Sequence, residues 1–134
     1  MKRFALLVFV SMLLFTGCTD SQEVQMIKNG TIGSCPDVTV GQMVDSFMTS
    51  PRWESGESNE GNIFVNVGGD ITYADKPVHA LIQFVVYNKK GQFEFQVLEF
   101  NRVPQMTLLA AGVMEKMCQR AGESNDKRTE LNRH

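Results

Sequence analysis

The sequence has little of what metal centres and hydrolytic enzymes need. It contains no Cys-x-x-Cys pair and only two histidines, His79 and His134, so the clustered ligands of a zinc site are missing. The Gly-x-Ser-x-Gly motif of serine hydrolases is absent. Gly68-Gly69-Asp70 lacks the lysine and the following helix of a phosphate-binding loop. The carboxylates are scattered among predicted caps, turns and loops, so we expect no catalytic residue, no metal, no cofactor and no enzyme activity.

The chain also lacks an excess of positive charge and a membrane-spanning apolar run. The chain has 13 basic and 15 acidic side chains. Removal of residues 1–17, which include Lys2 and Arg3, would leave a net charge of −4. An acidic chain argues against nucleic acid, which attracts a basic surface. It argues equally against electrostatic docking on anionic lipid. The apolar stretch from Phe4 to Phe15 is shorter than the ~20 residues of a spanning helix.

That short stretch instead predicts a secretory signal over residues 1–17. Basic residues precede it and the small pair Thr16-Gly17 follows it, directly before Cys18. The segment resembles a bacterial lipobox, in which Cys18 is lipidated and becomes the first mature residue. The alternative is an ordinary signal in which Cys18 is incidental. Because Thr19 rather than Asp follows Cys18, the resemblance favours a lipid anchor in the outer membrane, facing the periplasm, over the inner membrane.

Two further cysteines bracket the patterned part of the chain. Cys35 and Cys118 form an even pair for an oxidising compartment once Cys18 carries lipid. A bridge between them would stabilise the domain by about 4 kcal/mol through loop closure. The alternative is two buried free thiols.

The remaining sequence predicts one α+β domain. A capping box from Thr39 to Gln42 opens a helix that ends before Pro51, and apolar spacing predicts a second helix over about 105–120. Alternating residues between them predict three to four antiparallel strands in a meander, with a bulge or bend at Gly68-Gly69 and a register slip near Leu98. We expect an N-terminal helix, this meander and a C-terminal helix, with the helices on one face of the sheet. Residues 18–27 would be a lipidated tether, 28–121 the domain and 122–134 a disordered polar tail.

Strand parity places an unusual set of residues on the outer face of this sheet. The set mixes large apolar side chains with polar neighbours and comprises Phe64, Leu81, Val85 and Tyr87. Such a patch marks a contact site on many proteins. Two alternatives stay open: the segment before Cys35 covers the patch, or single exposed apolar residues are tolerated there. Trp53 is expected in the core rather than at a binding surface, and His79 at the surface.

Several short motifs resemble a small bacterial domain found in predicted lipoproteins and at the ends of membrane-anchored chains, some of which carry a zinc ribbon. They are Lys28-Asn29-Gly30-Thr31, Thr39-Val40-Gly41-Gln42, Pro51-Arg52-Trp53-Glu54, Ile82-Gln83-Phe84 and Val103-Pro104-Gln105. The resemblance covers roughly 26–118 and implies a domain, with no activity attached. Because the ribbon cysteines are missing here, no metal carries over.

These features predict a lipid-anchored, non-enzymatic envelope protein that acts as a protein-binding or scaffold module, with an envelope protein as partner and no nucleic acid. The contact would use the open sheet face or a sheet edge. The alternative is a small periplasmic ligand carrier or an enzyme inhibitor. A carrier would need an incompletely filled core, and an inhibitor would use the loop of residues 55–61 as a plug.

Overall fold

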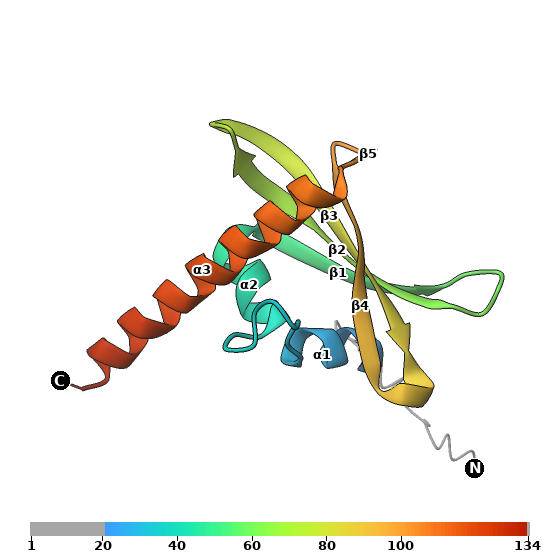
Figure 1. Ribbon diagram of the computed structural model, residues 1–134, viewed down its shortest axis with the longest axis horizontal. Helices are drawn as coiled ribbons and strands as arrows, with labels where there is room; N and C mark the ends of the chain where they lie inside the picture. Colours follow the sequence, from blue (N-terminus) through green and yellow to red (C-terminus); the bar gives the residue numbers. More distant parts are fainter. Residues whose placement is uncertain (1–20, 134) are drawn as a thin grey trace, which may run out of the picture.

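The computed structural model describes residues 21–133, which form an α+β fold built on one antiparallel sheet. Five strands follow one another in chain order, so each strand pairs with the next (Figure 1). They are β1 (Thr49–Glu57), β2 (Ile63–Tyr73), β3 (Lys76–Tyr87), β4 (Gln92–Phe100) and β5 (Val103–Pro104). The meander is thus confirmed, with a short fifth strand beyond the three to four predicted. A 3₁₀ turn, η1 (Asn88–Lys90), links β3 to β4 and ends at Gly91 with φ 62°.

Three helices lie on the same side of this sheet: α1 (Gln22–Asn29), α2 (Val40–Phe47) and α3 (Thr107–Leu131). Helix α1 lies largely within the predicted tether, so that boundary was wrong. Its signal is weak because the helix has only eight residues and buries just Val24 and Ile27. Ser21 opens it, since the Ser21 side chain accepts a hydrogen bond from the Val24 amide at 3.2 Å.

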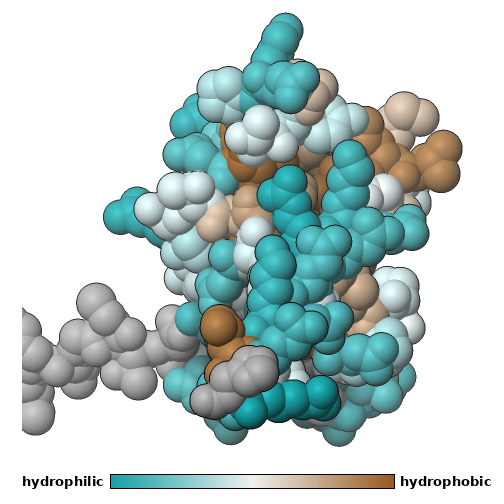
Figure 2. All heavy atoms as spheres, turned by 90° about the vertical axis from the view of Figure 1, so that its left-hand side faces the viewer, coloured by the Kyte–Doolittle hydropathy of each residue, from teal (hydrophilic) through white to brown (hydrophobic). Residues whose placement is uncertain are grey.

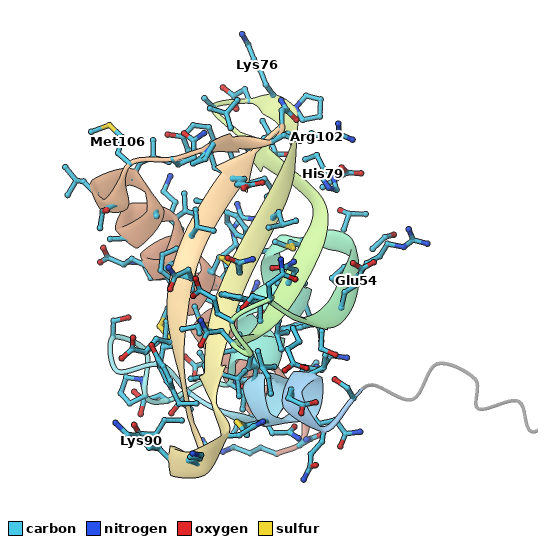
Figure 3. All side chains as sticks on the ribbon, turned by 90° about the vertical axis from the view of Figure 1, so that its right-hand side faces the viewer. Glu54, Lys76, His79, Lys90, Arg102 and Met106 are labelled. Carbon is cyan, nitrogen blue, oxygen red and sulfur yellow. A yellow bond between two sulfur atoms is a disulfide. The ribbon has the colours of Figure 1, made fainter. Side chains whose placement is uncertain are left out.

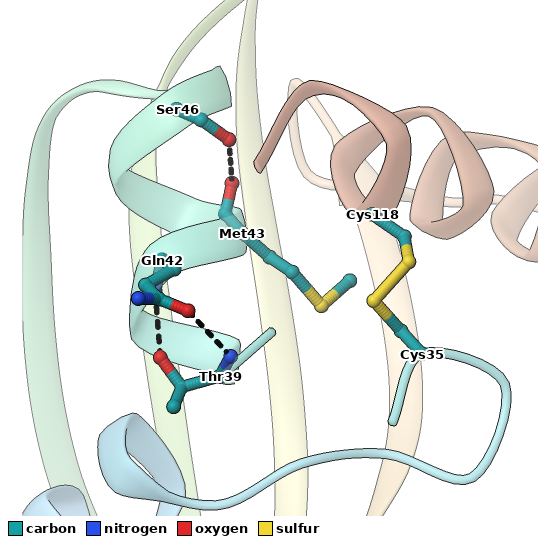
Figure 4. Close-up of a disulfide and its surroundings, with 6 residues drawn as sticks. All are labelled: Cys35, Thr39, Gln42, Met43, Ser46 and Cys118. Carbon is teal, nitrogen blue, oxygen red and sulfur yellow. Dashed lines mark hydrogen bonds between the residues drawn. A yellow bond between two sulfur atoms is a disulfide. The ribbon is translucent and has the colours of Figure 1, made fainter. Parts of the chain in front are cut away.

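The loop and helix that follow α1 confirm two predictions. The Thr39 hydroxyl accepts a hydrogen bond from the Gln42 amide at 3.1 Å, and the Gln42 side chain accepts one from the Thr39 amide at 2.9 Å (Figure 4). This reciprocal capping box satisfies two helix-end donors. Just before it, Cys35 is joined by a disulfide to Cys118 of α3. The bridge therefore ties the loop before α2 to the C-terminal helix.

The core lies between the three helices and one face of the sheet. Its largest fully buried members come from every layer and include Ile27 (α1), Met43 (α2), Ile82 and Phe84 (β3), Leu98 (β4) and Met117 (α3). Trp53 of β1 packs against this core in a half-buried position, with the Lys28 ammonium 5.3 Å from its ring centre. Trp53 therefore lies on the core side of the sheet, as expected, but at the margin of the core rather than within it.

The strand register departs from the sequence-based expectation at two points. The β2–β3 ladder runs without a shift through Gly68 and Gly69. The β1–β2 ladder does shift there, because Thr49 pairs with Asp70 and Arg52 with Gly68, so the irregularity predicted at Gly68-Gly69 exists but its extra residue belongs to β1. Position 69 favours glycine because the backbone of β1 lies close to it: a Cβ on Gly69 would be 3.0 Å from the Thr49 carbonyl oxygen. The slip predicted near Leu98 is real but lies earlier, because Gln83 pairs with Val97 while Phe84 pairs with Phe95, which leaves Gln96 as the extra residue.

Helix α3 continues to Leu131, so the prediction of a disordered tail from Gly122 was wrong. After the last buried residue, Ala121, most side chains of α3 are exposed and the helix projects from the body (Figure 1). Extending a helix that is already packed avoids the cost of nucleation. The polar residues of this segment include Glu123 and Lys127 at the favourable i, i+4 spacing. Polarity without apolar periodicity was therefore misread as disorder.

Candidate functional site

The sheet face opposite the helices is left open. Cross-strand pairs Phe64–Val85, Asn66–Gln83 and Gly68–Leu81 lie on it, because each neighbouring pair in the ladder, such as Val65–Phe84, belongs to the core. Helix α1 and the loop before Cys35 lie on the core side, where Val24 and Ile27 are buried. Among the described residues, the idea that the segment before Cys35 covers this face is therefore wrong. Figure 3 looks onto the face, with Glu54 and His79 labelled.

A cluster of apolar side chains occupies the centre of the open face, and we call it the open-face cluster. It consists of Phe64, Leu81, Val85, Tyr87 and Val97. None of the five belongs to the hydrophobic core of the described chain. Val85 is nevertheless only 7 % exposed, Tyr87 is 42 % exposed, and the other three are half-buried. Phe64 and Val85 are directly opposed on neighbouring strands, where side chains lie in contact range.

Val97 is the member that the sequence did not predict. Uninterrupted alternation from Phe93 and Phe95 places Val97 with them on the buried face. The extra residue Gln96 reverses the parity, so Val97 pairs with Gln83 and faces outward. Leu98 and Phe100, which the same slip turns inward, are buried. The opposite parity of Leu98 and Phe100 was the available signal, and it placed the slip two residues too late.

Charged side chains surround the open-face cluster, and most of them are acidic. Glu54 and Arg52 face outward from β1, Glu94 and Glu99 from β4, and Asp70 from β2. The Tyr87 hydroxyl reaches the Glu94 carboxylate at 3.4 Å, and the His79 ring lies 3.4 Å from Asp70. The side chains of His79 and Asp70 are 57 % and 72 % exposed, as predicted for His79. With four carboxylates against Arg52 and His79, the rim carries net negative charge.

One buried polar atom at the centre of the face has no partner within the described chain. The Oδ1 atom of Asn66 is shielded from solvent and accepts no hydrogen bond. Buried acceptors are paired in nearly all native structures, because an unmade hydrogen bond costs free energy. Asn66 stands opposite Gln83, beside the pairs that hold Phe64 and Leu81. Because this atom is closed even to water, it offers no accessible acceptor on the face.

The structure brings the predicted contact residues together on one face. Among residues 21–133, no three histidine, cysteine or acidic side chains gather as a metal site would require. Cys18 and the predicted signal over 1–17 lie outside the described residues. No helix in the described part of the chain is long and apolar enough to cross a membrane. Figure 2 shows the side opposite to the open face, viewed from the C-terminal end of α3, and most of its surface is hydrophilic.

Comparisons with known proteins add no relative. No family model matches the chain, and neither a curated protein nor a solved structure resembles it significantly. The family resemblance seen in the sequence motifs therefore stays a prediction. Any functional inference depends on the residues themselves.

Proposed function

We propose that the protein is a lipid-anchored, non-enzymatic envelope module that binds another envelope protein through the open face of its sheet. The observation that supports this most strongly is the open-face cluster. Five apolar side chains share a surface that no described segment covers. A contiguous apolar patch with a polar rim is typical of protein contact sites.

The charged rim indicates the chemistry of that partner. Carboxylates of Glu54, Glu94 and Glu99 surround the apolar centre, so a complementary surface would present Lys or Arg around an apolar core. The lipid would be carried by Cys18, which is also the basis for placing the protein in the outer membrane, facing the periplasm.

Photocrosslinking in the living cell tests this proposal. A benzoylphenylalanine placed at Gln83, between Phe64 and Leu81 on the open face, should give one discrete cross-linked species. The same probe at Glu123, exposed on the projecting part of α3, serves as the matched control and should not give it. Adding Leu81→Arg to the Gln83 probe should remove the species, because it places a buried charge at the contact centre.

Stability and binding must be separated in this experiment. Leu81 is half-buried outside the core, so Leu81→Ser should cost about 1–2 kcal/mol of unfolding free energy. Phe84 is fully buried, so Phe84→Ala should cost about 3–5 kcal/mol. The proposal is wrong if Leu81→Arg folds and retains the cross-link, or if the Gln83 and Glu123 probes give the same product.

The inhibitor alternative has a smaller structural basis. Residues 55–57 belong to β1, so only a short turn is left of the loop predicted as a plug. In this turn the Ser58 amide donates a hydrogen bond to the Asn62 carbonyl at 2.8 Å. The hairpin of β1 and β2 does project from the body (Figure 1). A cross-link from Asn59 at this turn, with none from Gln83, would favour the inhibitor.

A further inference from the structure

The outer edge of β4 is free along its first half. β5 pairs only with Glu99 and Phe100, and the Gln105 amide donates to the Leu98 carbonyl at 2.8 Å. Within the described chain, no strand lies beside residues 92–97 on the side away from β3. An exposed strand edge offers unpaired amide and carbonyl groups to another extended chain. The bulge at Gln96 limits regular pairing to the first residues of β4.

A groove of about 690 Å³ opens beside this same edge, which is within the range of ligand sites. Phe93 and Phe95 of β4 line its floor. One wall is the loop of residues 31–34, and the other is a face of α3 with Thr107, Ala111, Met114 and Glu115. A strand added to β4 would direct every second side chain to the helix side of the sheet. Those side chains would enter the groove.

The disulfide holds the two walls of the groove together. The loop wall ends at Cys35, whose amide donates to the Ile32 carbonyl at 2.9 Å, and Cys35 is bonded to Cys118 of the helix wall. The groove therefore has a fixed width before anything binds. A preformed site loses less conformational entropy on binding than one that must be ordered.

The charge that lines the groove is negative. Glu115 on the α3 wall is ionisable, and no lysine or arginine is among the lining residues. The carboxylate of Glu94 lies on the open face, beside the Tyr87 hydroxyl. Small side chains, Gly33 and Ala111, leave the space open on both walls. A complementary occupant combines apolar side chains with positive charge and has an extended backbone.

We infer that this groove and the free edge of β4 bind an extended, basic peptide segment of a protein partner. The segment pairs with β4 through its backbone, inserts alternate apolar side chains over Phe93 and Phe95, and places Lys or Arg against Glu115. The site is separate from the open face, because Phe93 and Phe95 lie on the core side of the sheet. The two proposals can therefore fail independently.

Selection from a phage library of random twelve-residue peptides tests this inference on the purified, oxidised full chain. We expect enriched peptides in which apolar residues alternate and Lys or Arg flank them. Ala111→Trp fills the groove from an exposed helix position and should weaken their binding by about tenfold or more, as loss of one buried apolar side chain does. Leu108→Trp is the matched control, because Leu108 is 81 % exposed and does not line the groove.

A charge exchange distinguishes recognition from a merely structural effect. Glu115→Lys should weaken binding of the basic peptides and strengthen binding of the same peptides when their Lys residues are replaced by Glu. Only every second backbone amide of the bound peptide would hydrogen-bond to β4. N-methylation of those amides should weaken binding of the peptide, whereas N-methylation of the intervening amides should not. Leu81→Arg on the open face should leave all of these affinities unchanged.

The inference is overturned by any of three results: no enrichment over the Ala111→Trp protein, no positive charge in the enriched peptides, or no effect of N-methylation in either phase. An acyl chain that co-purifies in the groove and blocks peptide binding would likewise overturn it in favour of a lipid ligand.

Discussion

Replacing both Cys35 and Cys118 by alanine should remove a large share of the stability of this domain. The bridge joins residues 83 apart in the sequence. Opening a loop of that length raises the entropy of the unfolded chain, which lowers the stability of the fold by about 4 kcal/mol. Domains of this size are stable by about 5–15 kcal/mol in total. The oxidised wild type should therefore be far more stable than the Cys35→Ala, Cys118→Ala protein, which should still fold because its core is otherwise intact.

Urea unfolding followed by fluorescence of Trp53 measures this difference. Trp53 is the one tryptophan of the chain, and it is half-buried against the core, so its emission reports loss of packing. The variant should show a lower midpoint and a steeper dependence on urea, because an unfolded chain without the bridge exposes more surface. A reducing agent should bring the wild type to the same midpoint and leave the variant unaffected.

Two results would refute this reasoning. A stability loss below about 1 kcal/mol would mean that the bridge does not constrain the unfolded chain as loop closure requires. Alkylation of both thiols in the wild type without reductant would mean that the protein does not form the bridge in its compartment.

Three further changes have defined outcomes in the same unfolding assay. Gly69→Ala should cost about 1–3 kcal/mol, because its Cβ would meet the Thr49 carbonyl at 3.0 Å; Gly56→Ala, with nothing within 4 Å, is the matched control and should change little. Ala74→Asn should stabilise by about 0.5–1 kcal/mol, because Ala74 has φ 50° in the β2–β3 turn, a conformation that asparagine adopts more readily than alanine. Ending the chain after Ala121 should cost less than about 1 kcal/mol, since later residues of α3 bury little. A larger loss would show that Ser124, Asn125 and Arg128, which line a shallow hollow together with α2, stabilise the fold more than their exposure indicates.

Sequence reasoning succeeded where one local rule determined the outcome. The Thr39–Gln42 capping box is a four-residue pattern with one geometry, and the alternation in β2 and β3 has one consistent parity. It failed where the deciding feature is non-local or short. Helix α1 is formed because Val24 and Ile27 reach a core built from distant strands. The Gln96 bulge changed the face of Val97 without any glycine or proline to mark it.

The candidate sites divide in the same way. Parity alone placed Phe64, Leu81, Val85 and Tyr87 on one face, and the pairing of β2 with β3 bears out that placement. The groove beside β4 could not be predicted, because its walls come from residues 31–34 and from α3. Only the packing of α3 against the sheet, which no local pattern encodes, brings these segments together.

The strand order has a consequence for how the chain reaches this fold. Every strand pairs with its sequence neighbour, and both the Ala74-Asp75 and the Asn101-Arg102 connections are tight turns with positive φ. Each hairpin can therefore close over a short loop at a small entropic cost, which favours rapid folding. Cys118 lies after the last strand, so its sulfur meets Cys35 only when the sheet and α3 are in place. The disulfide thus stabilises the folded structure after it has formed and does not direct its folding. We therefore expect the reduced chain to adopt the same fold.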